Sequence, residues 1–161
     1  MEIVLAAVHP DSAEGRTALS RYAHELAERA PVPPAPSWTE DFLAADPSAL
    51  APPRGLFVVA TIGEDVVGCA GLRLVGQDVP LGAGEIKRMW VDPTVRGRRL
   101  GTRLLDHLVD IARESGLRRI VLDTRGDLTE ARALYAREGF VEIESYNQNP
   151  DAEHWYARDL W

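Results

Sequence analysis

A glycine- and arginine-rich segment near the middle of the chain has the residue types that bind phosphate groups. It reads Arg96-Gly97-Arg98-Arg99-Leu100-Gly101-Thr102 and lies between a predicted strand and a predicted helix. The start of a helix carries unpaired N–H groups and a positive dipole end, which suit anionic oxygens. Arginine adds charge, and glycine lets the backbone approach a ligand. The segment predicts a phosphate-binding turn; the alternative is a tight strand-to-helix turn with a solvated basic face.

Charge is distributed in a way that favours a small anionic ligand. The 161 residues carry 25 acidic and 18 basic side chains, a net charge of −7. Residues 87–103 hold six basic residues and one acidic residue, a net +5, so the rest of the chain carries −12. An acidic chain disfavours nucleic acid as a partner. Its acidic remainder mildly favours a cationic second ligand.

Other reactive constellations are absent from the sequence. No Gly-Lys-Ser/Thr follows the turn and no Gly-x-Gly-x-x-Gly occurs, which excludes a P-loop and a dinucleotide fingerprint. The four histidines lack metal-ligand spacing, so we expect no metal. Cys69 is the only cysteine, and its alternating apolar neighbours predict a core position.

The elements that must position the turn follow from hydrophobic periodicity and from glycine and proline breaks. Alternating strands and helices predict a fold that mixes α/β and α+β character: a mixed, mostly antiparallel sheet with helices on both faces. Asp127 and Glu130 suggest a capping box for the last helix. The predicted strands are 1–8, 56–62, 66–74, 85–91, 119–123, 140–143 and 155–161, and the predicted helices are 11–30, 38–45, 100–115 and 127–138.

Two motifs, one at residues 96–101 and one at residues 131–140, resemble those of the GNAT superfamily of acetyl-coenzyme A-dependent N-acetyltransferases. The family turn reads Arg/Gln-x-x-Gly-x-Gly/Ala, and here Arg99 stands in place of its first glycine. The second motif is Ala131-x-x-Leu134-Tyr135-x-x-x-Gly139-Phe140, and Leu128 stands where the family often has asparagine. The resemblance covers about residues 56–143 and implies a GNAT-type fold.

The resemblance also implies how the chain is organised around acetyl-CoA. We expect one domain, 1–161, with acceptor-side helices and loops (1–53), an acetyl-CoA-binding core (55–143) and a C-terminal loop and strand (144–161). The pantetheine arm is expected between strands 85–91 and 119–123, bonded by the backbone of Met89, Trp90 and Val91, whose side chains we expect to pack in the core. The turn from Arg96 to Thr102 is expected to hold the pyrophosphate.

Two side chains are implied to be catalytic. An alkylamine has a pKa near ~10, so the site must remove a proton before attack. Glu85 matches a family position that often holds the base; the alternative is that it only pairs with Lys87 or Arg88. Tyr135 matches the family's general acid, which protonates the departing thiolate; the alternative is an aromatic side chain packed on the sheet.

The implied activity is transfer of acetyl to a primary amine of a small molecule or peptide by direct attack in a ternary complex. A non-catalytic acyl-CoA sensor is the alternative. Loops 31–53 and 146–150 are expected to form the acceptor pocket, although a simple turn is the alternative for the second. With no leader or apolar membrane-spanning run in the sequence, we expect a cytoplasmic protein that does not bind membranes, and a homodimer is possible.

Overall fold

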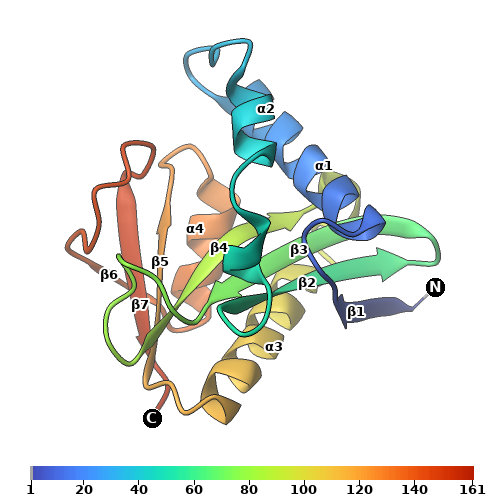
Figure 1. Cartoon of the computed structure of the whole chain (residues 1–161). Helices are drawn as coiled ribbons and strands as arrows, with labels where there is room; N and C mark the ends of the chain where they lie inside the picture. The colour runs from blue at the N-terminus through green and yellow to red at the C-terminus, as the bar shows by residue number, and fades with distance from the viewer. Residues whose placement is uncertain (1) are drawn as a thin grey trace.

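A computed structural model describes residues 2–161, which form one mixed sheet with helices on both faces (Figure 1). The strands are β1 (Ile3–Ala7), β2 (Gly55–Ile62), β3 (Asp65–Arg73), β4 (Ala83–Val91), β5 (Arg119–Thr124), β6 (Val141–Ile143) and β7 (His154–Asp159). The helices are α1 (Ala13–Arg29), α2 (Trp38–Leu43), α3 (Leu100–Glu114) and α4 (Thr129–Arg137), with the short 3-10 helices η1 (Pro47–Leu50) and η2 (Pro93–Val95).

The strand order is β1-β2-β3-β4-β5-β7-β6, and every neighbouring pair is antiparallel except β4 and β5. Ladder pairing of β4 with β5 covers only Ala83–Glu85 against residues 119–121. Beyond that point the two parallel strands diverge. The sheet therefore contains an opening at its centre, between the second half of β4 and the end of β5.

A β-bulge lies in β4 beside this opening. Cys69 of β3 pairs with Trp90 and Gly71 pairs with Lys87, so two β4 residues face one β3 residue. Arg88 lies in the bulge with a positive φ of 59°. An extra residue interrupts the alternation of side chains along a strand. Consequently Lys87 and Arg88 both project from the face of the sheet that α1 and α2 cover.

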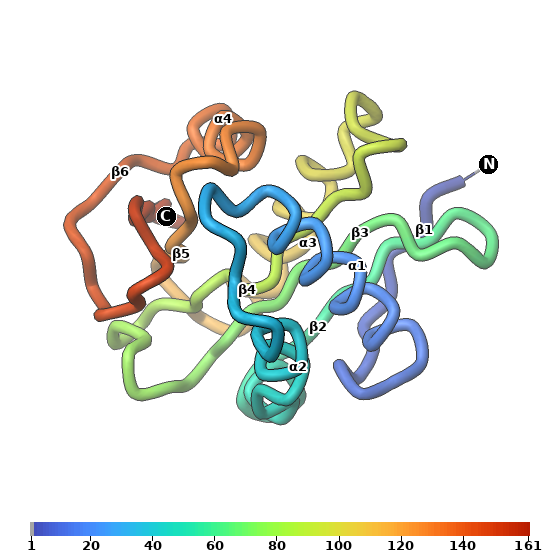
Figure 2. The backbone as a smooth tube through the Cα atoms, turned by 90° about the horizontal axis from the view of Figure 1, so that it is seen from above, coloured from blue at the N-terminus to red at the C-terminus, as the bar shows by residue number. Residues whose placement is uncertain are grey.

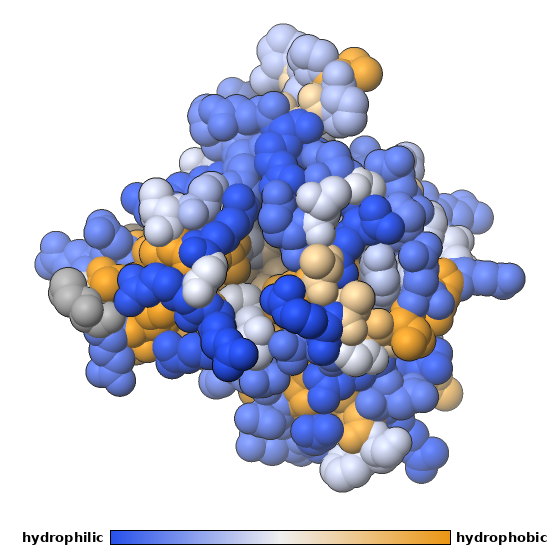
Figure 3. Space-filling view, turned by 180° about the vertical axis from the view of Figure 1, so that it is seen from behind, coloured by the Kyte–Doolittle hydropathy of each residue, from blue (hydrophilic) through white to orange (hydrophobic). Residues whose placement is uncertain are grey.

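Each face of the sheet has its own apolar core. Leu104, Leu108 and Tyr135 of α3 and α4 pack on one face, against β-strand residues such as Ile86. Ala18 of α1 packs on the other face, and α1 lies over β2 to β4 (Figure 2). Seen from behind, the outer surface is mainly hydrophilic, with apolar residues in separate patches (Figure 3). No helix within residues 2–161 has the length and apolar character needed to cross a bilayer.

The predicted fold class and elements are confirmed, with element ends that differ by no more than two residues. Met1 of the first predicted strand lies outside the described residues. The predicted capping box is wrong. Leu128 is the N-cap of α4 and no side chain caps it, because the Asp127 carboxylate binds Arg125 at 2.8 and 2.9 Å and Glu130 pairs with Arg29 at 3.0 Å. Both carboxylates thus pair with arginine side chains, where the two partners carry opposite charges.

Candidate active site

The turn before α3 presents an uncapped helix N-terminus. Arg99 is the N-cap residue, in a left-handed conformation with φ 62° and ψ 22°, and no side chain caps the helix. In α1, by contrast, the Ser12 hydroxyl accepts a bond from the Gly15 N–H at 3.1 Å. A Cβ built on Gly97 would have open space around it. The first-turn N–H groups of α3 are thus accessible to an anionic group, which fits the pyrophosphate of coenzyme A.

Gly101 contributes to the packing of α3 against α4, a role that the sequence did not suggest. A Cβ at this position would lie 2.7 Å from Cδ2 of Leu134, so the missing side chain lets α3 approach α4 rather than admitting a ligand. The Thr102 hydroxyl similarly donates to Glu138, the C-cap residue of α4, at 3.0 Å. What these two residues can offer a ligand is their backbone N–H groups.

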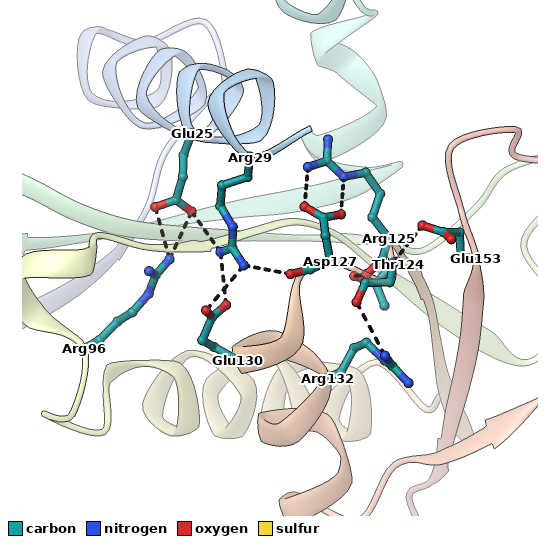
Figure 4. A network of polar contacts seen from close by, with 10 residues as sticks. Glu25, Arg29, Arg96, Thr124, Arg125, Asp127, Glu130, Arg132 and Glu153 are labelled. Carbon is teal, nitrogen blue, oxygen red and sulfur yellow. Dashed lines mark hydrogen bonds and ion pairs between the residues drawn. The ribbon is translucent and has the colours of Figure 1, made fainter. Parts of the chain in front are cut away.

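Arg96 is tied into a charged network that joins the turn to α1 and α4 (Figure 4). Its guanidinium donates to both carboxylate oxygens of Glu25, at 3.0 and 3.1 Å. Glu25 also lies 4.0 Å from Arg29, which pairs with Glu130 of α4 at 3.0 Å. The Arg96 charge is therefore largely matched within the protein, and the exposed Arg98 and Arg99 carry the turn's remaining positive charge.

The three predicted pantetheine-binding residues of β4 keep their side chains in the two cores. Trp90 is 4% exposed on the α1 side, and Met89 and Val91 pack on the α3 side. Because β5 pairs with β4 only as far as Glu85, the edge of β4 beyond it is free of ladder partners on that side. An extended ligand could add there as a strand does.

Tyr135 projects from α4 into the core beneath the sheet, where it is 4% exposed. Its ring lies 5.8 Å from that of Phe140 and 6.0 Å from that of Tyr156. Burial raises the pKa of Tyr135 far above the usual phenol value, and Tyr22 and Asp123 raise it further. At neutral pH the Tyr135 hydroxyl is a protonated donor.

Glu85 is fully buried on the α1 side of β4. Its Oε2 accepts a hydrogen bond from the Tyr146 hydroxyl at 2.6 Å and lies 3.5 Å from Lys87 Nζ. Its Oε1 lies 3.3 Å from Arg73 Nη1, without the geometry of a hydrogen bond. Pairing with Lys87 is as expected, whereas the expected alternative of pairing with Arg88 is wrong, because the bulge turns that side chain toward α2.

Glu85 lies at the wall of a pocket of about 440 Å³. Asp123 at the end of β5 binds Lys87 at 3.5 Å, Asn147 at 2.7 Å and Asn149 at 3.2 Å. The side chains of loop 146–149 therefore line this pocket, which is one of the two roles considered for residues 146–150 from the sequence. Arg73 and Asp123 were missed as site residues, because only their register beside β4 reveals them. Residues 2–161 contain no cluster of three or more His, Cys, Asp or Glu side chains arranged to hold a metal ion.

Comparison with known proteins agrees with this geometry. A family model described as the acetyltransferase (GNAT) family matches residues 19–140. The chain is 40% identical to the IAA acetyltransferase of Azospirillum brasilense over 97 residues, 60% of this chain and 61% of that protein. It is 38% identical to the N-alpha-acetyltransferase RimI of Mycobacterium tuberculosis over 94 residues, 58% of this chain and 57% of that one. The match thus spans about three-fifths of each relative.

Solved structures share the whole fold at low sequence identity. A GNAT-family acetyltransferase of Staphylococcus aureus has a TM-score of 0.79 and 19% identity, with 99% of this chain and 100% of that one covered. The PaiA N-acetyltransferase of Thermoplasma acidophilum, solved with coenzyme A, has a TM-score of 0.76 and 13% identity, with 99% of both chains covered. With a family model that spans both motifs and a sheet that opens between β4 and β5, the chain belongs to the GNAT family of acetyltransferases.

Proposed function

We propose that the protein transfers the acetyl group of acetyl-CoA to a primary amine of a small molecule or peptide, by direct attack within a ternary complex. One observation carries the proposal. The sheet opens between β4 and β5 just beyond Glu85, which lines a pocket on one face, and Tyr135 belongs to the core on the other face. The names of the relatives, N-acetyltransferases among them, support an amine acceptor.

Acetyl-CoA supplies an activated thioester, and the chain's own groups bind and orient it. The uncapped start of α3, with Arg98 and Arg99, would hold the pyrophosphate. The free edge of β4 would bond the extended arm along Met89, Trp90 and Val91. A backbone N–H in this segment would also stabilise negative charge on the acetyl oxygen.

Glu85 is proposed as the group that receives the amine proton. Its Oε1 is buried and accepts no hydrogen bond within residues 2–161, so one acceptor position of the carboxylate is unused. Arg73 and Lys87 lie 3.3 and 3.5 Å from the carboxylate and pair with its charge. Tyr146 holds the other oxygen and so fixes the carboxylate's orientation.

Tyr135 is proposed as the acid that protonates the departing thiolate. Burial makes its phenol a weaker acid than a free tyrosine. The same desolvation raises the basicity of a thiolate that forms beside it, so the two effects partly cancel. When the proton moves as the C–S bond breaks, neither a free thiolate nor a free phenolate has to form.

Release of free thiol from acetyl-CoA with a panel of amines tests the proposal. We expect Tyr135→Phe to lower kcat by about 100-fold or more while coenzyme A still binds. Replacement Glu85→Gln should change the pH–rate profile. Unchanged turnover in Tyr135→Phe would exclude its role as the acid, and an unchanged profile in Glu85→Gln would exclude the base. Thermal protection by coenzyme A without turnover on any amine would instead support a non-catalytic sensor.

A further inference from the structure

Arg88 is a charged side chain that the protein itself leaves without a counterion. The residue is half-buried in the β4 bulge, next to the opening where transfer is proposed. Within residues 2–161 it takes part in no ion pair or hydrogen bond through its guanidinium. The neighbouring cations differ, since Arg73 pairs with Glu85 and Lys87 pairs with both Glu85 and Asp123.

The groups that surround Arg88 are neutral at physiological pH. Its guanidinium carbon lies 3.7 Å from the centre of the Phe42 ring of α2. The titratable groups that act on it are Tyr22 and Cys69. Burial raises the pKa of Tyr22 to about 12 and raises the pKa of Cys69 above its usual value, so neither supplies a negative charge. Burial also lowers the pKa of Arg88 itself.

This arrangement costs free energy twice. A partly buried charge without a counterion is unfavourable. The φ of 59° adds strain, because left-handed backbone is disfavoured for any residue with a Cβ. Stacking on Phe42 offsets part of the cost and fixes the plane of the guanidinium. Strain and an unpaired charge beside a reaction site are typical of a binding group.

We propose that Arg88 binds a carboxylate of the acceptor, so that the substrate is an amine that also carries an acid group, such as an amino acid or a short peptide. This inference rests on the proposed acetyl transfer. A guanidinium held in one plane matches a carboxylate with two parallel hydrogen bonds. The amine end has its own partners nearby. Glu85 lies three residues earlier on the same face of β4, roughly 10 Å along the strand, with Asp123 across the opening.

The aromatic residues of α1 and α2 complete the proposed site. Phe42 lies 5.9 Å from Tyr22 and 5.2 Å from Trp38, ring centre to ring centre, and all three rings are half-buried. They form an apolar wall beside the guanidinium. A wall of this kind excludes water from the ion pair and contacts the carbon skeleton of an acceptor.

The test compares acids with their own carboxamides. Purified protein and acetyl-CoA are given α-amino acids, ω-amino acids and dipeptides, each as the free acid and as the amide, and kcat/KM is measured by thiol release. We expect the acids to be preferred by about 10- to 100-fold, the effect of one charge-assisted contact. Arg88→Gln should abolish the preference by lowering the values for the acids alone, and Arg88→Lys should retain part of it. Arg137→Gln, which removes an exposed charge from α4, is the matched control and should behave as wild type.

Calorimetric titration of the same compounds in the presence of coenzyme A separates this inference from the proposed function. Acids that bind through Arg88 but are not acetylated would overturn acetyl transfer to amines and leave the carboxylate site standing. Amines acetylated without preference for the acid would overturn the carboxylate site alone, as would an Arg88→Gln variant that loses acids and amides equally. No binding and no turnover with any member of the panel would overturn both.

Discussion

Replacing Arg99 with glycine should make the protein more stable, although it removes a residue from the turn that is proposed to hold the cofactor. Arg99 occupies left-handed backbone at the position where the GNAT family turn has its first glycine. Left-handed backbone costs a residue with a Cβ about 1–2 kcal/mol. The arginine also places a positive charge at the positive end of the α3 dipole, which costs about 0.3–1 kcal/mol.

Glycine has its own cost, because it loses about 0.5–1 kcal/mol more backbone entropy on folding. The terms sum to a net stabilisation of about 1 kcal/mol for Arg99→Gly, or a rise in Tm of about 2–4 °C for a chain of this size. Urea denaturation followed by tryptophan fluorescence measures the difference, with the m-value expected to stay unchanged.

Arg98→Gly is the matched control for this prediction. Arg98 is exposed and carries the same charge one residue earlier, but its φ is not positive. The control removes charge without relief of strain, so we expect it to be neutral or slightly destabilising. Equal stabilities for the two variants, or a loss of stability in Arg99→Gly, would show that the left-handed backbone at residue 99 is not strained.

Three further changes are predicted from contacts around the site. Gly101→Ala should destabilise the protein by about 1 kcal/mol in urea denaturation, because the overlap of the new methyl group with Leu134 outweighs the roughly 0.5–1 kcal/mol that alanine gains over glycine in a helix, and trimming Leu134 to alanine should restore part of the loss. Asp127→Asn should lower the stability of the protein at neutral pH, because hydrogen bonds from Arg125 hold the pKa of Asp127 below its ordinary 3.8. The difference from wild type is present above pH 3.8 and vanishes as the pH falls through the lower pKa of the folded state. A difference in chemical denaturation that does not depend on pH would contradict this prediction. Tyr146→Phe should lower kcat about 10-fold or more with little effect on coenzyme A affinity, because it removes a 2.6 Å hydrogen bond to the proposed base; unchanged turnover by thiol release would contradict that positioning role.

The secondary structure could be predicted because its signals are local. Gly116, with a φ of 78°, follows α3 at the end of the predicted helix 100–115, and Gly63, with a φ of 61°, lies between the predicted strands 56–62 and 66–74. The capping box failed for a reason that a local motif cannot show. Arg125 lies two residues before Asp127 and Arg29 lies on a distant helix, and both compete for the capping carboxylates.

Only part of the candidate site could be predicted from the sequence. Motif spacing indicated Glu85, Tyr135 and the turn, since each occupies a fixed place in the family pattern. The partners of Glu85 come from β3 and from the loop after β6, so they depend on register and on chain return rather than on sequence distance. Regular alternation would place Lys87 and Arg88 on opposite faces, and nothing in the sequence marks a bulge there.

The bulge distorts the part of β4 beside which acetyl transfer is proposed. Ladder pairing with β5 ends at Glu85, and Arg88 and Met89 have no register partner in β3. At Arg88 and Met89 the strand therefore has no register partner on either side, and the same distortion turns the Arg88 side chain toward α2. A variant that removed one bulge residue would restore the regular ladder to β3 and reverse the faces of the side chains before or after it. Loss of turnover with retained coenzyme A binding is the expected result, because the uncapped start of α3 lies beyond the repaired strand and keeps its N–H groups.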